Sequence, residues 1–173
     1  MSVTQRQKLA RVLKCSPNEI KKYERSYEFN VISDDVIDEI KSRILRHETI
    51  KTLSNSYYQY AVTNGAKAVQ EKKLAVSGID GIFNGAFISD DVGYAKPSKE
   101  FFNFVLDNIP KASNYEIMIV GDSLTSDIKG GNNMGFKTCW FNPHHLPLSK
   151  EYSVDYQIDN IDSIFDALKQ ENS

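Results

Sequence analysis

Short apolar runs alternate with amphipathic segments from about Phe83 to the end of the chain. A short apolar run bounded by turn residues is typical of a buried strand, and apolar positions three and four residues apart are typical of a helix. Strands and helices that alternate in this way build a parallel sheet covered by helices on both faces. We therefore expect a three-layer α/β fold. The predicted strands are Tyr57–Val62, Ala86–Ser89, Ile117–Val120, Lys137–Phe141 and Val154–Ile158.

Three segments of this region carry clear helix start and stop signals. Pro97 and Ser98 open the first helix, and Pro110 closes it. The second begins near Thr125 and stops around Gly135, where glycine tolerates the left-handed conformation of a helix end. The third is a terminal helix whose apolar positions are Ile161, Ile164, Phe165 and Leu168.

The first 55 residues differ from the rest, because they contain helical patterns and no convincing strand. The expected helices cover Arg6–Leu13, Pro17–Tyr27 and Asp35–Leu53, the last with apolar positions along one side. The chain therefore divides into a helical segment, residues 1–47, and an α/β core, residues 48–173. No Gly/Ser linker separates them, so we expect the two parts to pack together.

The composition is that of an ordinary globular protein. Of 173 residues, 40% are hydrophobic and 25% are charged, which argues against disorder and low-complexity filaments. The net charge of −2 gives no general attraction to nucleic acid or an anionic membrane. No apolar run approaches the roughly 20 residues of a membrane helix. Two separated cysteines, Cys15 and Cys139, match no metal spacing, and together with a polar N-terminus they predict a cytoplasmic protein.

Polar side chains that could bind a phosphorylated ligand follow the predicted strands. Thr63 and Asn64 come directly after the first strand. Lys96 stands before the helix opened by Pro97, where a cation and helix N–H groups can share one anion. Ligands of open parallel sheets lie at the carboxyl ends of the strands, so these side chains point to a ligand site.

Two carboxylates follow the strand Ile117–Val120. Asp122 comes directly after Gly121, and Asp127 lies five residues further on. Such a pair suits Mg²⁺, which takes one or two carboxylates together with waters and phosphate oxygens at about 2.0–2.1 Å. Each cluster alone is a weak signal, but the three in this order form a specific set.

As a set, these motifs resemble those of the haloacid dehalogenase-like (HAD) hydrolases, which are mostly Mg²⁺-dependent phosphatases. Val62–Gly65, Lys96–Pro97 and Gly121–Ser123 with Asp127 are similar to the second, third and fourth motifs of that family. The resemblance covers roughly Glu48 to Leu168 and implies a Rossmann-like core with a small helical cap. The pyrimidine 5′-nucleotidase and noncanonical-nucleotide phosphatase branch is the most similar, over Lys96–Phe102, Gly121–Gly131 and Cys139–Pro143.

The resemblance implies a role for each of these residues. Thr63 would hold a phosphoryl oxygen through its hydroxyl and backbone N–H, and Asn64 would border the same pocket. Lys96 would neutralise the phosphoryl group and the attacking carboxylate. Asp122 would ligate Mg²⁺ directly, while Asp127 would hold a metal-bound water or orient Lys96. The implied ligand is a small phosphorylated metabolite or a nucleoside 5′-monophosphate, and catalysis would rest on positioning and charge neutralisation.

The first motif of the family is missing from the sequence. It supplies the nucleophile, an aspartate that ends the first strand and precedes a second aspartate by two residues. The chain contains no Asp-x-Asp sequence, and in the nearest candidate, Ser33-Asp34-Asp35, the two acids are adjacent. We therefore expect an N-terminally truncated chain that keeps a remnant of the cap and has little activity alone.

Loss of that first strand would leave a gap between the strands that end at Val62 and Val120, because the family places it between them. Two unpaired strand edges would then face the gap. The chain could close the gap by rearranging, fill it with Tyr27–Ile32, or take a strand from a partner. A homodimer is one form that such a partnership could take.

Two other functions fit parts of the sequence. A catalytically dead protein could keep the phosphate and metal pocket for binding or regulation. The segment from Thr4 to Glu24 also resembles two helices of a phage-repressor-type helix-turn-helix, and the first 25 residues carry seven Lys or Arg against two Glu. The usual preceding helix is absent and one residue is extra, so nucleic acid is the least favoured partner.

Overall fold

The computed structural model describes residues 46–78 and 81–171. The expected helices Arg6–Leu13 and Pro17–Tyr27, the helix-turn-helix segment, Cys15 and the gap-filling candidate Tyr27–Ile32 lie outside these residues. The chain divides into two compact units, Met1–Glu48 and Thr49–Ser173. The strands and the candidate site belong to the second unit.

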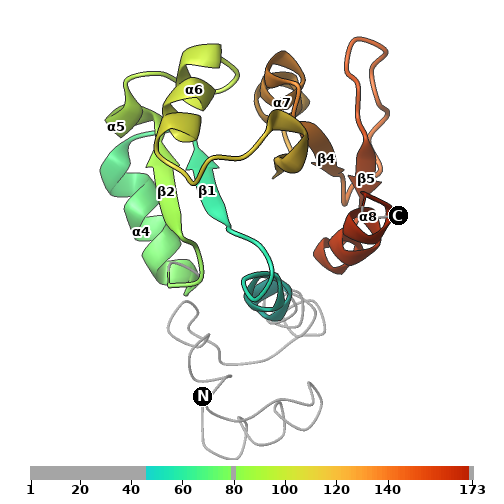
Figure 1. Cartoon of the computed structure of the whole chain (residues 1–173), viewed down its shortest axis with the longest axis horizontal. Helices are drawn as coiled ribbons and strands as arrows, with labels where there is room; N and C mark the ends of the chain where they lie inside the picture. Colours follow the sequence, from blue (N-terminus) through green and yellow to red (C-terminus); the bar gives the residue numbers. More distant parts are fainter. Residues whose placement is uncertain (1–45, 79–80, 172–173) are drawn as a thin grey trace, which may run out of the picture. The chain divides into compact units, whose positions relative to one another are not determined.

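The second unit alternates strands and helices, as the sequence predicts (Figure 1). All five predicted strands are present, although some of their ends shift by one to three residues. The strands are β1 (Tyr60–Thr63), β2 (Gly85–Ile88), β3 (Met118–Gly121), β4 (Lys137–Phe141) and β5 (Tyr156–Ile158). Residues 46–53 are helical, and from β1 onward the described α-helices are α4 (Lys67–Ser77), α5 (Ser89–Val92), α6 (Lys99–Asp107), α7 (Lys129–Met134) and α8 (Ile164–Glu171). Single turns are η1 (Asn114–Glu116), the π-helical η2 (Leu124–Ile128) and η3 (Ile161–Ser163).

The first strand begins later than predicted. Tyr57 and Tyr58 precede β1 and are 42% and 72% exposed, so the prediction that they are strand residues, at the start of Tyr57–Val62, is wrong. The backbone N–H of Tyr57 donates to the carbonyl of Leu53 at 2.9 Å, which continues the preceding helical turn. Only Tyr60 of the three tyrosines belongs to the strand.

Helix α4 has no counterpart among the predicted elements. It has no buried residue, and its valines, Val69 and Val76, are 50% and 63% exposed. A helix without a buried apolar stripe gives no periodic signal in the sequence. Neither α4 nor any other helix in the described ranges is long and apolar enough to cross a membrane.

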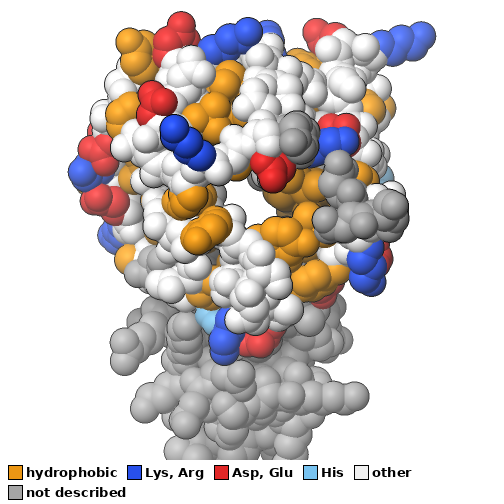
Figure 2. Space-filling view, viewed as in Figure 1, with side chains coloured by type: hydrophobic (Ala, Val, Ile, Leu, Met, Phe, Trp, Pro, Cys, Tyr) orange, Lys and Arg blue, Asp and Glu red, His pale blue; other side chains and the backbone are white. Residues whose placement is uncertain are grey.

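The strands pair in parallel, which confirms the α/β class, but they form two sheets. β1 pairs with β2, and β3, β4 and β5 form the second sheet in that order. Within the described residues β1 and β3 are not paired, so the prediction that the chain closes the gap by rearranging is wrong. The two sheets lie apart in Figure 1, and Figure 2 shows an opening between them bordered by hydrophobic side chains. Val120 of β3 is 40% exposed, which is unusual for a strand of a parallel sheet.

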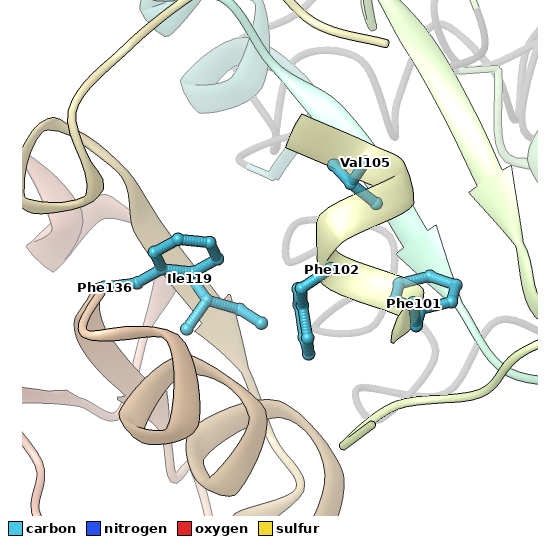
Figure 3. Close-up of a cluster of buried hydrophobic side chains, with 5 residues drawn as sticks. All are labelled: Phe101, Phe102, Val105, Ile119 and Phe136. Atoms are coloured by element: carbon cyan, nitrogen blue, oxygen red, sulfur yellow. The ribbon is translucent and has the colours of Figure 1, made fainter. Parts of the chain in front are cut away.

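A cluster of buried side chains joins helix α6 to the second sheet (Figure 3). Its members come from α6, β3 and the turn after α7, and are Phe101, Phe102, Val105, Ile119 and Phe136. The Phe102 ring contacts Phe101 and Phe136 edge to face, with ring centroids 5.4 Å and 5.8 Å apart. Half-buried Val62 of β1 and Phe87 of β2 pack against the same cluster. Helix α6 therefore connects two sheets that share no hydrogen-bonded strand pair in the described part of the chain.

We expect Gly130→Ala to destabilise this cluster. A Cβ at Gly130 would lie 2.3 Å from the Phe102 ring. The ring must move or leave its pocket, so the free energy of unfolding should fall by about 1–3 kcal/mol. Urea unfolding of the full chain measures the change.

Gly81→Ala is the matched control, because no atom lies within 4 Å of a Cβ at Gly81. This variant should unfold within about 0.5 kcal/mol of the wild-type chain. Equal losses in the two variants would contradict the close packing of Phe102 on Gly130.

Candidate functional site

Lys96 and Asp127 form a buried ion pair at the carboxyl ends of the strands. The Lys96 Nζ lies 2.6 Å from the Asp127 Oδ1, and the two side chains are 9% and 8% exposed. The same Nζ donates to the backbone carbonyl of Val62 in β1 at 2.7 Å. An ammonium has three N–H donors. The third finds no acceptor among the described residues, so it can bind an oxygen of a ligand.

The π-helical turn η2 fixes the carboxylate of Asp127. Its Oδ2 accepts a hydrogen bond from the backbone N–H of Ser123 at 3.2 Å. The backbone N–H groups of Asp127 and Ile128 both donate to the Ser123 carbonyl, at 2.9 Å and 3.1 Å. A Cβ at Gly121 would lie 2.4 Å from the Asp127 carboxylate, so only glycine fits there. Both oxygens of Asp127 are thus engaged, and its contacts are those of a residue that orients Lys96.

Asn64 holds the backbone of Lys96. Its Nδ2 donates to the Lys96 carbonyl at 2.9 Å, and its Oδ1 accepts from the Lys96 backbone N–H at 2.9 Å. Both polar ends of the amide are therefore used within the protein. Asn64 and Lys96 belong to separate sequence motifs, and the structure brings the two motifs into direct contact.

Thr63 is the last residue of β1, and α4 orients its hydroxyl. The Thr63 Oγ1 donates to the Gln70 Oε1 at 3.2 Å, while the Gln70 Nε2 donates to the Asn64 carbonyl at 3.2 Å. The second bond fixes which end of the Gln70 amide faces Thr63. Sequence reasoning missed Gln70, because a half-buried glutamine on a helix without a buried residue carries no motif.

Further contacts brace the loop after β1 against α5. The backbone N–H of Gly65 donates to the Ser89 Oγ at 2.9 Å, and that of Lys67 donates to the Asp90 Oδ2 at 3.0 Å. The Lys67 Nζ lies 2.9 Å from the Asp91 Oδ1. This hydrogen bond and the charge of Asp91 raise the pKa of Lys67. The carboxylates of Asp90 and Asp91 in α5 therefore both bind Lys67.

Asp122 is the exposed carboxylate of the site. Its side chain has no hydrogen bond or ion pair in the described part of the chain, and its backbone carbonyl accepts the indole N–H of Trp140 at 3.0 Å. Mg²⁺ binds one or two carboxylates and fills its other positions with water and phosphate oxygens. An exposed carboxylate that has no partner among the described residues fits a direct ligand of that ion.

No three His, Cys, Asp or Glu side chains within residues 46–78 and 81–171 gather into a metal site. The neighbouring histidines His144 and His145 are therefore not part of such a group. A cation at Asp122 would need water, substrate oxygens or a further carboxylate to complete its shell.

Comparisons with known proteins agree with the fold and the motifs. The family model described as haloacid dehalogenase-like hydrolase matches residues 2–141. The HAD hydrolase YfnB of Bacillus subtilis is 40% identical over 126 residues, which cover 73% of this chain and 54% of that protein. The pyrimidine 5′-nucleotidase PynA of Streptococcus pneumoniae is 37% identical over 123 residues, which cover 70% of this chain and 52% of that protein.

A solved structure of this family has a similar fold. The crystal structure of YfnB bound to magnesium superposes with a TM-score of 0.68 at 28% identity, and the match covers 97% of this chain and 84% of that one. The chain spans about half the length of the curated relatives described above.

Lys96→Met should lower the free energy of unfolding by about 3–5 kcal/mol, because it leaves the Asp127 charge buried without a partner. Addition of Asp127→Leu removes that charge and should recover most of the loss. Urea unfolding of the wild-type chain, of each single variant and of the double variant gives the coupling free energy of the pair.

The exposed pair Lys169 and Asp166 is the control for this cycle. Its Nζ–Oδ1 distance is 3.2 Å, and its side chains are 76% and 74% exposed. Exposed pairs of this kind contribute about 0.5 kcal/mol or less. A coupling for Lys96 and Asp127 as small as the control value would contradict the burial argument.

Proposed function

Because the chain belongs to the haloacid dehalogenase-like hydrolases, we propose that its site serves Mg²⁺-dependent hydrolysis of phosphomonoesters. The observation that carries this proposal is the Lys96 ammonium, which Asp127 and Val62 hold while its third N–H has no acceptor in the described part of the chain. A buried, fixed cation with a free donor suits the oxygens of a phosphoryl group. Nucleoside 5′-monophosphates are the first substrates to test, because PynA is a pyrimidine 5′-nucleotidase.

Each side chain takes its role from its contacts. The free N–H of Lys96 binds a phosphoryl oxygen and offsets its charge. The Thr63 hydroxyl, which donates to the Gln70 Oε1 in the structure, would rotate and donate to a second phosphoryl oxygen. Asn64 keeps the lysine loop in place. Asp122 holds Mg²⁺, which when bound polarises the phosphoryl group and neutralises developing charge.

The attacking group is the part that the described residues do not supply. Hydrolysis through a phospho-aspartyl intermediate needs a carboxylate in line with the leaving oxygen, and the sequence contains no Asp-x-Asp. We propose that this carboxylate arrives at the end of an extended segment that pairs with both β1 and β3. Among the described residues nothing pairs with the inner edges of these strands, and Val120 is 40% exposed. These two observations and the opening in Figure 2 support this placement.

A turnover assay tests the proposal. The full chain is incubated with p-nitrophenyl phosphate and Mg²⁺, alone or with a synthetic peptide of four Val or Ile residues followed by Asp-Gly-Asp. The chain alone should be no more active than the Lys96→Met/Asp127→Leu chain, since loss of a covalent nucleophile costs about 10⁴- to 10⁶-fold in turnover. The peptide should restore Mg²⁺-dependent turnover.

The control is the same peptide with Asn-Gly-Asn in place of Asp-Gly-Asp, and it should restore no turnover. Robust turnover by the chain alone would contradict the proposal that the nucleophile comes from another segment. Calorimetry with inorganic phosphate and Mg²⁺ separates the remaining outcomes. Binding without turnover under every condition would favour the alternative function, a binding or regulatory protein that keeps the pocket.

A further inference from the structure

Trp140, the single tryptophan of the chain, lies directly behind the acidic loop. It stands on β4 in register with Gly121, the last residue of β3, and is 2% exposed. Its indole N–H donates to the backbone carbonyl of Asp122 at 3.0 Å. A buried indole N–H generally finds some acceptor. Here the acceptor belongs to the residue whose carboxylate is the proposed ligand of Mg²⁺.

The peptide group between Asp122 and Ser123 is held from both sides. Trp140 binds its carbonyl oxygen, and its N–H donates to the Asp127 Oδ2 at 3.2 Å. The C=O and N–H of a planar trans peptide point in opposite directions. Each hydrogen bond therefore stabilises the orientation that the other requires. Rotation of this plane by half a turn would direct the carbonyl oxygen at the Asp127 carboxylate, which repels it.

This peptide completes a continuous path of hydrogen bonds. Trp140 holds the peptide, the peptide holds the Oδ2 of Asp127, and the Oδ1 of Asp127 holds Lys96. Hydrogen bonds in such a chain polarise one another. The Asp122 carboxylate itself has no partner in residues 46–78 and 81–171. The position from which this side chain starts therefore depends on the backbone that Trp140 fixes.

We propose that Trp140 is a positioning residue of the site. Its indole N–H orients the peptide after Asp122, and so aims the Asp122 carboxylate at the cation and keeps the Ser123 N–H on Asp127. The part of this inference that concerns Mg²⁺ rests on the proposed function. The part that concerns the peptide does not, and the two are measured separately.

The test replaces the indole N–H alone. Because the chain has one tryptophan, growth of a tryptophan auxotroph on an analogue changes only position 140. β-(3-Benzothienyl)alanine keeps the bicyclic shape and carries sulfur in place of the N–H, whereas 7-azatryptophan keeps the N–H. In ¹H–¹⁵N spectra of the full chain, amide exchange at Ser123 should be about tenfold faster with the sulfur analogue. It should return close to the wild-type rate with 7-azatryptophan.

The amide of Thr138, which donates to the Asp155 Oδ2 at 2.8 Å, is the internal control. Its exchange should be the same in all three chains. Ser123 exchange that is equal in all three chains overturns the inference. Exchange that is faster at Ser123 and Thr138 alike also overturns it, because that pattern reports general loosening.

Titration of the same samples with MgCl₂ tests the coupling to the metal. The sulfur analogue should weaken Mg²⁺ binding about tenfold, equivalent to ~1.4 kcal/mol, and the N–H analogue should not. Equal affinities in the three chains overturn the claim that Trp140 aims Asp122. If the signals of the wild-type loop do not respond to Mg²⁺, the proposed metal site fails, while the exchange comparison still decides whether Trp140 holds the peptide.

Discussion

The buried ion pair between Lys96 and Asp127 is the interaction on which the candidate site depends. Removal of two charges from water costs several kcal/mol per ion, and only good geometry and further hydrogen bonds offset that cost. The structure supplies both. The ammonium also bonds the Val62 carbonyl of β1, and the carboxylate also accepts the N–H of Ser123. One cation thus links the end of the first sheet to the loop that leaves the second.

The contacts of Lys96 matter because the strands form two separate sheets. Within the described residues β1 and β3 are not paired with each other or through another strand. The two sheets share an apolar contact, the buried cluster around Phe102 of α6, to which both contribute side chains. The polar contacts at the strand ends add a second connection, since the Lys96 Nζ donates both to the Val62 carbonyl of β1 and to the Asp127 carboxylate, which follows β3. The opening between the two sheets is bordered by hydrophobic side chains (Figure 2). An arrangement of this kind positions the groups proposed to bind phosphate, and it leaves room between the sheets for the proposed segment that carries the attacking carboxylate.

Much of this arrangement could be predicted from the sequence, because strands and their polar ends leave local signals. The apolar run before Gly121 and the capping signal at Ser98 gave β3 and the start of α6 within a residue. The contacts that orient the site could not be predicted. Gln70 lies on a helix without an apolar stripe, and Trp140 looks like an ordinary core residue of a strand. Their roles depend on which backbone atoms the fold brings within hydrogen-bond distance, and residue spacing carries no information about that.

A crystal structure of the full chain grown with MgCl₂ and inorganic phosphate tests the central claim most directly. We expect a phosphate oxygen within hydrogen-bond distance of the Lys96 Nζ and of the Thr63 hydroxyl. We also expect Mg²⁺ bound directly by the Asp122 carboxylate, with the Lys96 to Asp127 pair intact. Phosphate and metal bound elsewhere, or an Asp122 carboxylate on the opposite side of the molecule from Lys96, would contradict it.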